Sequence, residues 1–389
     1  MNVLFLTHSF PRDSGDAAGS FVLRLARALG GEGITVDVVA PGARGLDTDA
    51  DLDGVRVHRF RYAPRRYETL AYGGNMAAQV RDSWSARFSL IGFLGAEFCA
   101  GVKARRVLQP ALVHAHWWFP NGVAATCVAR MAGVPLVTTL HGTDVRMARN
   151  IALSRPAFRH VLKNSAEVTA VSRWLADETQ SIVSTRRPTV APMPVATELF
   201  GVGSSAERLP RLLFVGRLMP QKGIDLLLDA LSRLPVGLGL DVVGDGPDRD
   251  ALEARAAALG VSDRVTFHGA VKQPALPAFY QRAAALIVPS TDEGLGLVAV
   301  EAQLCETPVV AFASGGLPDV IQHERTGILV EERSAEALAT AIQTMLERPD
   351  RGASLGGAGR LHALATFAPE SVARRYADIY RSVIGRGTA

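Results

Sequence analysis

Short apolar runs alternate with amphipathic segments along the whole chain, and this alternation restricts the fold more than any other feature. In the first half, strand-type runs are expected at 3–6, 34–39, 112–114, 136–140 and 167–171, and apolar residues recur at helical spacing over 21–29. Buried strands that alternate with helices form a parallel sheet covered on both faces. The first half is therefore predicted to be a doubly wound, Rossmann-like α/β domain.

The second half repeats this architecture. Strands are expected at 211–215, 239–243, 265–268, 284–288 and 308–312, and helices at 223–234, 249–259, 277–282 and 297–304. A Pro-containing stretch at 190–194 and a Gly/Ser linker at 201–205 separate the halves. We expect domains at 1–195 and 196–368, with a helix at about 369–389 that packs back on the first domain. Ligands of such sheets bind beyond the carboxyl ends of the strands, which predicts an interdomain cleft between facing domains.

Composition excludes several classes of protein. The net charge of +4 comes without a nucleic-acid-binding motif, so no nucleic acid partner is expected. Three cysteines, none in a C-x-x-C pair, argue against a disulfide framework or zinc site and suit the reducing cytoplasm. The first residues form a strand pattern unlike a signal peptide, and no run approaches the 18 or so apolar residues of a membrane span. Neither half carries the Gly-x-Gly-x-x-Gly motif of a dinucleotide-dependent dehydrogenase.

Two cations follow the first strand of the second half. The segment 214–223 reads Phe-Val-Gly-Arg-Leu-Met-Pro-Gln-Lys-Gly, which places Arg217 and Lys222 in a loop between a strand and a helix. Cations beside a helix N-terminus stabilise a diphosphate. The alternative is that Arg217 and Lys222 are solvated surface charges. The flanking glycines favour a ligand-binding loop over this alternative.

Two glutamates frame the start of a later helix. Glu293 lies in the loop after the strand 284–288, and Glu301 lies eight residues on, within the following helix. Gly294 and Gly296 allow backbone N–H groups to approach a ligand at the positive end of that helix. A carboxylate accepts hydrogen bonds from a vicinal diol, so Glu301 suits a ribose and Glu293 suits sugar hydroxyls. The alternatives are a helix-start carboxylate for Glu293 and an exposed helix position for Glu301.

These segments together resemble the retaining GT-B glycosyltransferases of family 4. Glu293 and Glu301, with seven residues between them, are similar to the E-x7-E signature of that family, and 216–218 followed by 222–223 is similar to its phosphate-binding loop. The segments 242–247, 267–271 and 311–318 also resemble family segments in the same order. The resemblance covers nearly the whole chain and is most specific in the second half.

The resemblance implies a role for each of these residues. Arg217 and Lys222 would bind the diphosphate of a UDP- or GDP-hexose, Glu301 the ribose, and Glu293 the transferred sugar. Further donor-binding groups would lie at Gly216, Gly294, Leu295, Gly296, Leu297, Val298 and, near the base, Val271. The implied reaction is a retaining transfer of a hexosyl group to a hydroxyl of a glycan, glycolipid or small molecule, as in lipid-linked glycan or polysaccharide synthesis. No cofactor is expected and, because no Asp-x-Asp motif is present, no metal.

The first half contributes three further candidates. His141 follows the strand 136–140, and the matching family histidine contacts the transferred sugar; Asp144 in the same loop is expected on the donor side. Gly19 ends a loop that resembles the family's amino-terminal glycine loop, although Phe21 stands where many members have histidine. We expect strand alternation to place His114 and His116 on opposite faces, which argues against a metal site.

The acceptor side leaves alternatives open. Basic residues outnumber acidic ones over 56–106, around an apolar, aromatic-bearing segment at 84–98. This pattern predicts either peripheral contact with an anionic membrane at its inner face or a core-facing helix with solvated arginines. A non-catalytic sugar-nucleotide or glycan binder, or a phosphorylase that uses free phosphate, would share the same fold.

Overall fold

The structure is a computed structural model that describes residues 1–13, 15–16, 18–72, 76–203 and 208–387. It divides the chain into two compact units: unit 1 is Met1–Pro194 with Pro369–Ala389, and unit 2 is Val195–Ala368. Small parts of the segments discussed above lie outside the described residues: residue 17 of the amino-terminal glycine loop, 73–75 of the basic segment, 204–205 of the linker, and 388–389 at the C-terminus.

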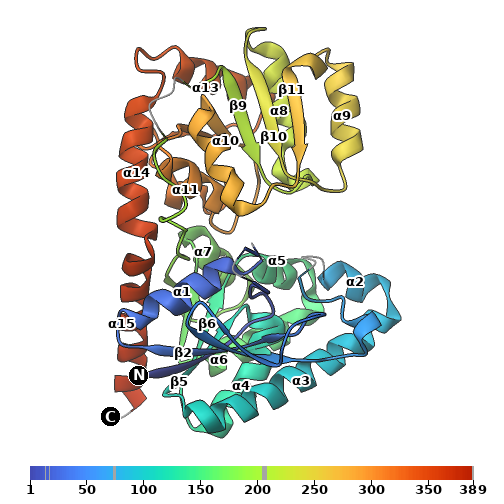
Figure 1. Ribbon diagram of the computed structural model, residues 1–389, viewed down its shortest axis with the longest axis vertical. Coiled ribbons are helices and arrows are strands. Elements are labelled where there is room, and N and C mark those ends of the chain that lie inside the picture. Colours follow the sequence, from blue (N-terminus) through green and yellow to red (C-terminus); the bar gives the residue numbers. More distant parts are fainter. Residues whose placement is uncertain (14, 17, 73–75, 204–207, 388–389) are drawn as a thin grey trace. The chain divides into compact units, whose positions relative to one another are not determined.

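Unit 1 is the part of the chain that carries β2, β5 and β6 in Figure 1. It contains an eight-stranded sheet of order β3-β4-β2-β1-β5-β6-β7-β8, in which only the β3–β4 pair is antiparallel. Its strands are β1 (Asn2–Leu6), β2 (Thr35–Pro41), β3 (Asp49–Leu52), β4 (Val55–Phe60), β5 (Leu112–His116), β6 (Leu136–Leu140), β7 (Glu167–Ala170) and β8 (Thr189–Val190). Its α-helices are α1 (Ser20–Gly30), α2 (Met76–Asp82), α3 (Trp84–Leu108), α4 (Val123–Ala132), α5 (Thr143–Asn150), α6 (Arg155–Asn164), α7 (Arg173–Ile182) and α15 (Pro369–Gly387). The predicted parallel α/β architecture is confirmed.

The C-terminal helix α15 is held to unit 1 by buried polar contacts. Its Tyr380 hydroxyl lies 2.7 Å from Nδ1 of His114 on β5, whose Nε2 lies 2.7 Å from Oγ1 of Thr139 on β6. The Tyr376 hydroxyl donates to the carbonyl of Ala191 at 3.1 Å. Buried polar groups that are this fully paired fix one packing arrangement of a helix. His114 is therefore a structural residue of the core.

Unit 2 contains a fully parallel six-stranded sheet of order β11-β10-β9-β12-β13-β14. Its strands are β9 (Arg211–Val215), β10 (Gly239–Val243), β11 (Val265–Gly269), β12 (Ala285–Val288), β13 (Val309–Phe312) and β14 (Ile328–Val330). Its α-helices are α8 (Ile224–Arg233), α9 (Arg249–Ala258), α10 (Leu276–Arg282), α11 (Leu297–Leu304), α12 (Leu317–Val320), α13 (Ala335–Leu346) and α14 (Ala353–Phe367). Every strand and helix predicted for this half is present.

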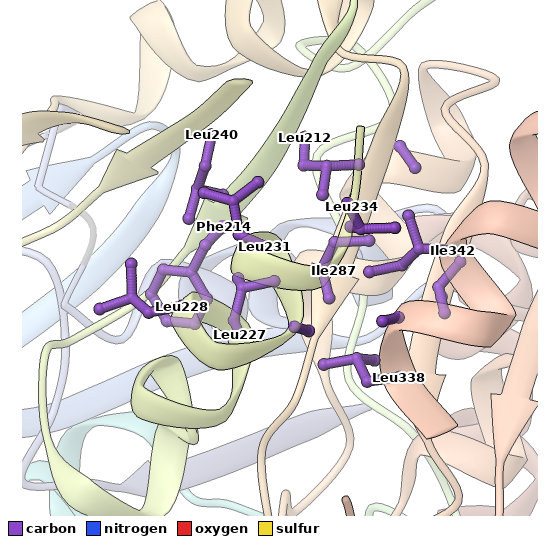
Figure 2. Close-up of a cluster of buried hydrophobic side chains, with 14 of the residues drawn as sticks. Leu212, Phe214, Leu227, Leu228, Leu231, Leu234, Leu240, Ile287, Leu338 and Ile342 are labelled. Atoms are coloured by element: carbon purple, nitrogen blue, oxygen red, sulfur yellow. The ribbon is translucent and has the colours of Figure 1, made fainter. Parts of the chain in front are cut away.

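The core of unit 2 lies where α8 and α13 pack against the sheet (Figure 2). Leu227 and Leu231 of α8 meet Phe214 and Ile287 from the strands, and Leu338 of α13 adds to the same cluster. Burying a side chain of this size contributes about 1.5–3 kcal/mol. The packing fixes the strands in register, so the loops after β9, β10, β12 and β13 leave the sheet at one common edge.

Helix α3 is longer than its apolar pattern predicted, because it continues past Gly101 to Leu108. Gly101 packs so closely that an added Cβ would lie 2.8 Å from Val128 of α4. By length and composition, α3 is the one helix of the described residues that could cross a membrane. Charged residues such as Arg87 and Glu97 interrupt this helix, so it contains no continuous apolar run of that length. Phe93 and Glu97 of α3 are nevertheless fully buried within unit 1.

Candidate functional site

The cationic loop of unit 2 is held in place by glycine. Gly223 has φ +67°, and a Cβ there would lie 2.2 Å from the carbonyl oxygen of Pro289, which follows β12. Only glycine allows this close approach of two backbones. The backbone N–H of Thr291 also donates to the carbonyl of Gln221 at 2.9 Å. The loop after β9 is thus fastened to the loop after β12, and Lys222 is carried toward Glu293.

Lys222 and Glu293 form an ion pair between Nζ and Oε1, with the two side chains 20% and 15% exposed. Arg217, at the other end of the same loop, is exposed, and no described residue provides it with a hydrogen bond or ion pair. Two cations and one carboxylate therefore gather at the carboxyl edge of the sheet. Arg217 is open to an anion, whereas the charge of Lys222 is shared with Glu293.

The loop before α11 is built from a second set of glycines. Gly296 has φ +91°, and a Cβ there would lie 2.6 Å from Leu317. Gly315 has φ +60°, and a Cβ there would meet the carbonyl oxygen of Glu293 at 2.4 Å, while the Gly316 N–H donates to that same carbonyl at 2.8 Å. The segment 314–316 therefore supports the Glu293 loop from behind. The resemblance to the family includes this segment, and these close contacts explain its two glycines.

The N-terminus of α11 provides an anion-binding element. The helix begins at Leu297 with no side-chain cap and no acidic residue in its first turn. The first N–H groups of a helix have no partner within the helix and carry a partial positive charge. Leu295 is buried, whereas Gly294, Leu297 and Val298 are partly exposed. The backbone at this point is suited to a phosphate or a sugar hydroxyl.

Glu301 is only 8% exposed, so the alternative of an exposed helix position is wrong. Its Oε2 accepts a hydrogen bond from the hydroxyl of Tyr280 on α10 at 2.8 Å. Tyr280 was not among the predicted site residues, because nothing local in the sequence links it to Glu301. An aromatic residue 21 positions upstream carries no spacing signal of its own.

The segment expected to hold the base, residues 268–271, spans the end of β11. His268 Nε2 lies 2.8 Å from Oδ1 of Asp241, which is also paired with Arg211. The side chain of His268 is thus engaged within the sheet edge. Val271, two residues after the strand ends, is partly exposed. Gly216 begins the cationic loop, and its N–H donates to the backbone carbonyl of Val243 at 3.0 Å.

In unit 1, His141 follows β6 and is oriented by its neighbours. Its ring stacks on Trp117 with centroids 4.1 Å apart, and its Nε2 lies 3.2 Å from Nδ1 of His116. Burial, with the nearby imidazoles of His116 and His8, lowers the pKa of His141 well below its usual value. His141 is therefore a neutral imidazole at pH 7.

The contacts of His116 assign the tautomer of His141. Burial lowers the pKa of His116 to about 3, and its Nε2 has no hydrogen-bond partner among the described residues. A buried N–H without a partner is rarer than a buried lone pair without one. We therefore assign the proton to Nδ1 of His116, which donates to Nε2 of His141. His141 then carries its own proton on Nδ1, ready to donate to a ligand oxygen.

The expectation that His114 and His116 point to opposite faces of β5 was wrong. Side chains two residues apart in a strand share a face. The two rings are 4.3 Å apart on the same side. His114 is committed to Tyr380 and Thr139, and the described residues contain no group of three or more His, Cys, Asp or Glu side chains that could hold a metal ion.

Asp144 holds the His141 loop in place. Its Oδ1 accepts from the N–H groups of His141 at 3.1 Å and Gly142 at 2.9 Å, and its Oδ2 accepts from the N–H of Trp118 at 3.2 Å. The side chain is 4% exposed. With both oxygens engaged by backbone donors, Asp144 orients His141, and a direct contact to a donor would require these bonds to break.

Gly19 is the N-cap residue of α1, with φ +72°, and a Cβ there would lie 2.2 Å from the carbonyl oxygen of Ser9. Glycine is therefore required for this loop to pack against the segment after β1. Phe21, in the first turn of α1, lies 5.4 Å from His141 and 5.9 Å from Trp117, centroid to centroid. A phenyl ring, which has no hydrogen-bonding group, thus lies beside His141.

Two Rossmann-like units, one of which presents cations and an uncapped helix N-terminus at the carboxyl edge of its sheet, define the class of GT-B nucleotide-sugar glycosyltransferases. Residues 196–362 match the family model described as Glycosyl transferases group 1, and residues 18–199 match the model described as Glycosyltransferase Family 4. The chain belongs to this glycosyltransferase family.

Known proteins align over nearly the full length. The chain is 33% identical to the D-inositol 3-phosphate glycosyltransferase of Mycobacteroides abscessus, over 97% of the chain and 86% of that protein. It is 29% identical to the GDP-mannose-dependent alpha-(1-6)-phosphatidylinositol monomannoside mannosyltransferase of Mycobacterium tuberculosis, over 97% and 98%. Sucrose-phosphate synthase from Thermosynechococcus elongatus has the same fold, with a TM-score of 0.80, 24% identity and 99% of each chain covered.

Proposed function

We propose that this chain transfers a hexosyl group from UDP- or GDP-hexose to an acceptor hydroxyl with retention of anomeric configuration. One observation carries the proposal: the loops after β9 and β12 are joined by the Lys222–Glu293 ion pair shortly before the N-terminus of α11, and the loop after β9 also carries the exposed Arg217. In this proposal, the positive charge stabilises the departing diphosphate and the carboxylate holds the transferred sugar.

The transition state of the transfer develops negative charge on the departing diphosphate. Arg217, Lys222 and the N–H groups at the start of α11 are arranged to stabilise this charge. In the proposal, Lys222 exchanges Glu293 for a phosphate oxygen when donor binds, and Glu293 is released to accept from a sugar hydroxyl. Glu301 accepts from the ribose hydroxyls. A phosphate oxygen of the leaving group takes the acceptor proton on the same face, and no metal takes part.

In this proposal, His141 contacts the transferred sugar. As a neutral imidazole with its proton on Nδ1, it donates to a sugar oxygen without adding a charge. Trp117, stacked on the ring, and Asp144, bound to the loop backbone, hold it in that orientation.

The names of the relatives suggest the acceptor class. One relative is named for D-inositol 3-phosphate and another for a phosphatidylinositol mannoside and a GDP-mannose donor. We propose an inositol-type polyol bearing phosphate, either free or lipid-linked, as the acceptor. Peripheral contact with the inner face of the membrane is part of this proposal: Trp84, Phe88 and Ile91 of α3 are about 70% exposed at helical spacing, and the Arg87 guanidinium lies 4.4 Å above the Trp84 ring.

A donor and acceptor panel tests the transfer. Purified chain is incubated with UDP-glucose, UDP-N-acetylglucosamine or GDP-mannose and with inositol 3-phosphate or phosphatidylinositol vesicles, and product is followed by mass spectrometry. The one-bond C1–H1 coupling in the NMR spectrum of the product assigns the anomer: an α-anomer supports retention, and a β-anomer contradicts it. Donor binding without turnover on any acceptor would indicate a non-catalytic binder. Product from a sugar 1-phosphate in place of the nucleotide donor would indicate a phosphorylase.

Vesicle sedimentation tests the membrane contact separately. We expect vesicles with phosphatidylinositol to retain the wild-type chain, and Trp84→Ser/Phe88→Ser to reduce retention at least tenfold. Leu153→Ser is the matched control, because Leu153 is 90% exposed elsewhere in unit 1. Equal retention of the wild type and the double variant would contradict the contact, without bearing on the transfer reaction.

A further inference from the structure

Tyr280 is joined to Glu301 through a buried hydrogen bond. Tyr280 lies on α10 with 0% of its surface exposed, and its hydroxyl donates to Oε2 of Glu301 at 2.8 Å. A phenol that donates to a carboxylate makes one of the stronger hydrogen bonds in proteins. Burial and the adjacent Glu301 raise the pKa of Tyr280 well above its usual value, so the hydroxyl keeps its proton.

The donor itself is held rigidly. The backbone carbonyl of Tyr280 accepts from Oγ1 of Thr307 at 2.7 Å and from Nη1 of Arg208 at 3.1 Å. The Tyr280 ring packs edge-on against Phe200, with centroids 5.7 Å apart. Arg208 also donates to carbonyls at the C-terminal ends of α10 and α11: Gln281, Ala283, Cys305 and Glu306. The two helices that carry Tyr280 and Glu301 are thereby tied together.

A glutamate has three side-chain torsions and loses rotamer freedom when it is ordered. A carboxylate that accepts from two vicinal hydroxyls must present both oxygens in one plane toward them. A fixed donor behind one oxygen selects the orientation before a ligand arrives, which lowers the entropic cost of binding. The arrangement resembles the general case in which supporting hydrogen bonds hold a ligand-contacting residue in place.

We propose that Tyr280 is a positioning residue: its hydroxyl orients the Glu301 carboxylate for a ribose diol and so selects ribonucleotide over deoxyribonucleotide donors. The inference rests on the proposed function, in which Glu301 binds the ribose.

The test is Tyr280→Phe, which removes one oxygen and keeps the ring. Calorimetric titration gives the Kd for UDP and 2′-deoxy-UDP and for GDP and 2′-deoxy-GDP. We expect the variant to lose about tenfold in affinity for the ribonucleotides and little for the deoxynucleotides, so that the ratio between them falls about tenfold. The donor KM should rise while kcat stays within about twofold. Glu301→Ala should lose the same discrimination, and the double variant should lose no more.

Tyr376→Phe is the matched control, because its buried hydroxyl donates to the Ala191 carbonyl in unit 1. It should lower thermal stability and leave the ribose discrimination at the wild-type value. If Glu301→Ala loses discrimination and folded Tyr280→Phe keeps it, the inference is wrong while the proposed function stands. If wild-type chain binds no nucleoside diphosphate, the proposed function itself is wrong.

A measurement on wild-type protein covers the case in which Tyr280→Phe does not fold. With ¹³Cζ-labelled tyrosine, the Tyr280 resonance should shift when UDP is added and stay in place when 2′,3′-dideoxy-UDP is added. A resonance that responds equally to both nucleotides would contradict the positioning role.

Discussion

Removal of the Lys222 charge should weaken both transition-state stabilisation and nucleotide binding, because Lys222 is proposed to bind a phosphate and also pairs with the Glu293 carboxylate. Lys222→Met deletes one of the two cations proposed to stabilise the leaving diphosphate. Loss of one such preorganised group costs about 2–4 kcal/mol of transition-state stabilisation, which is about 30- to 900-fold in kcat/KM. The variant also leaves the Glu293 carboxylate, which is 15% exposed in the ion pair, without its cation and facing an anionic ligand.

Coulomb's law gives the size of the repulsion between the Glu293 carboxylate and a bound diphosphate. Two unit charges about 6–8 Å apart at an effective dielectric constant of about 20 interact by about 2–3 kcal/mol. Glu293→Gln added to Lys222→Met should therefore recover UDP or GDP affinity by at least tenfold. The same Glu293→Gln change in an otherwise wild-type chain should leave nucleotide affinity equal or tighter, because Lys222 is then free to bind phosphate, while sugar transfer falls.

Isothermal titration with UDP and GDP at low and high salt measures these four proteins. The recovery should shrink at high salt, because screening weakens charge–charge terms. Arg255→Met is the matched control: Arg255 forms an ion pair with Asp229 elsewhere in unit 2, and its loss should leave nucleotide affinity unchanged. Lys222→Met with wild-type UDP and GDP affinity, or a double variant with no recovery, would refute the argument.

Three further predictions follow from the structure. Gly223→Ala should lower Tm by roughly 2–8 °C and abolish transfer, whereas Gly260→Ala, at the same φ but with open space around it, should keep transfer; equal activity of the two would contradict the proposed loop packing. Burial lowers the pKa of His116 to about 3, so below about pH 6.5 the unfolded chain binds more protons than the folded chain. Acidification from pH 7 to pH 5 should therefore lower the free energy of unfolding by about 2 kcal/mol through this group, as measured by urea denaturation. His116→Gln should show a correspondingly smaller loss. Transfer should proceed at the same rate in EDTA, and a loss reversed by added Mg²⁺ would show that a metal takes part.

The strands and helices were predictable because their signals are local. The runs before Val215 and Val288 are apolar, and glycines such as Gly223 and Gly296 mark the turns that follow them. Helix α3 exceeded its pattern because Gly101, a weak helix former, is compensated by close packing on α4. The helix propensity of the local sequence does not take this tertiary packing into account.

The candidate site was predictable only where chemistry and spacing coincide. Glu301 could be named from its distance to Glu293, but its burial and its bond to Tyr280 depend on how α10 packs against α11. Asp144 was assigned to the donor from its place beside His141, whereas its carboxylate binds the loop backbone. Such roles depend on tertiary contacts between distant parts of the chain, which no single stretch of sequence specifies.

The most direct test of the central claim compares nucleoside with nucleoside diphosphate. The Kd values of uridine and UDP, and of guanosine and GDP, are measured for the wild-type chain and for Arg217→Ala/Lys222→Ala. If these two side chains hold the diphosphate, the preference for UDP or GDP over the nucleoside should fall on the order of 100-fold in the double variant. A double variant that keeps the wild-type preference would show that the diphosphate is bound elsewhere.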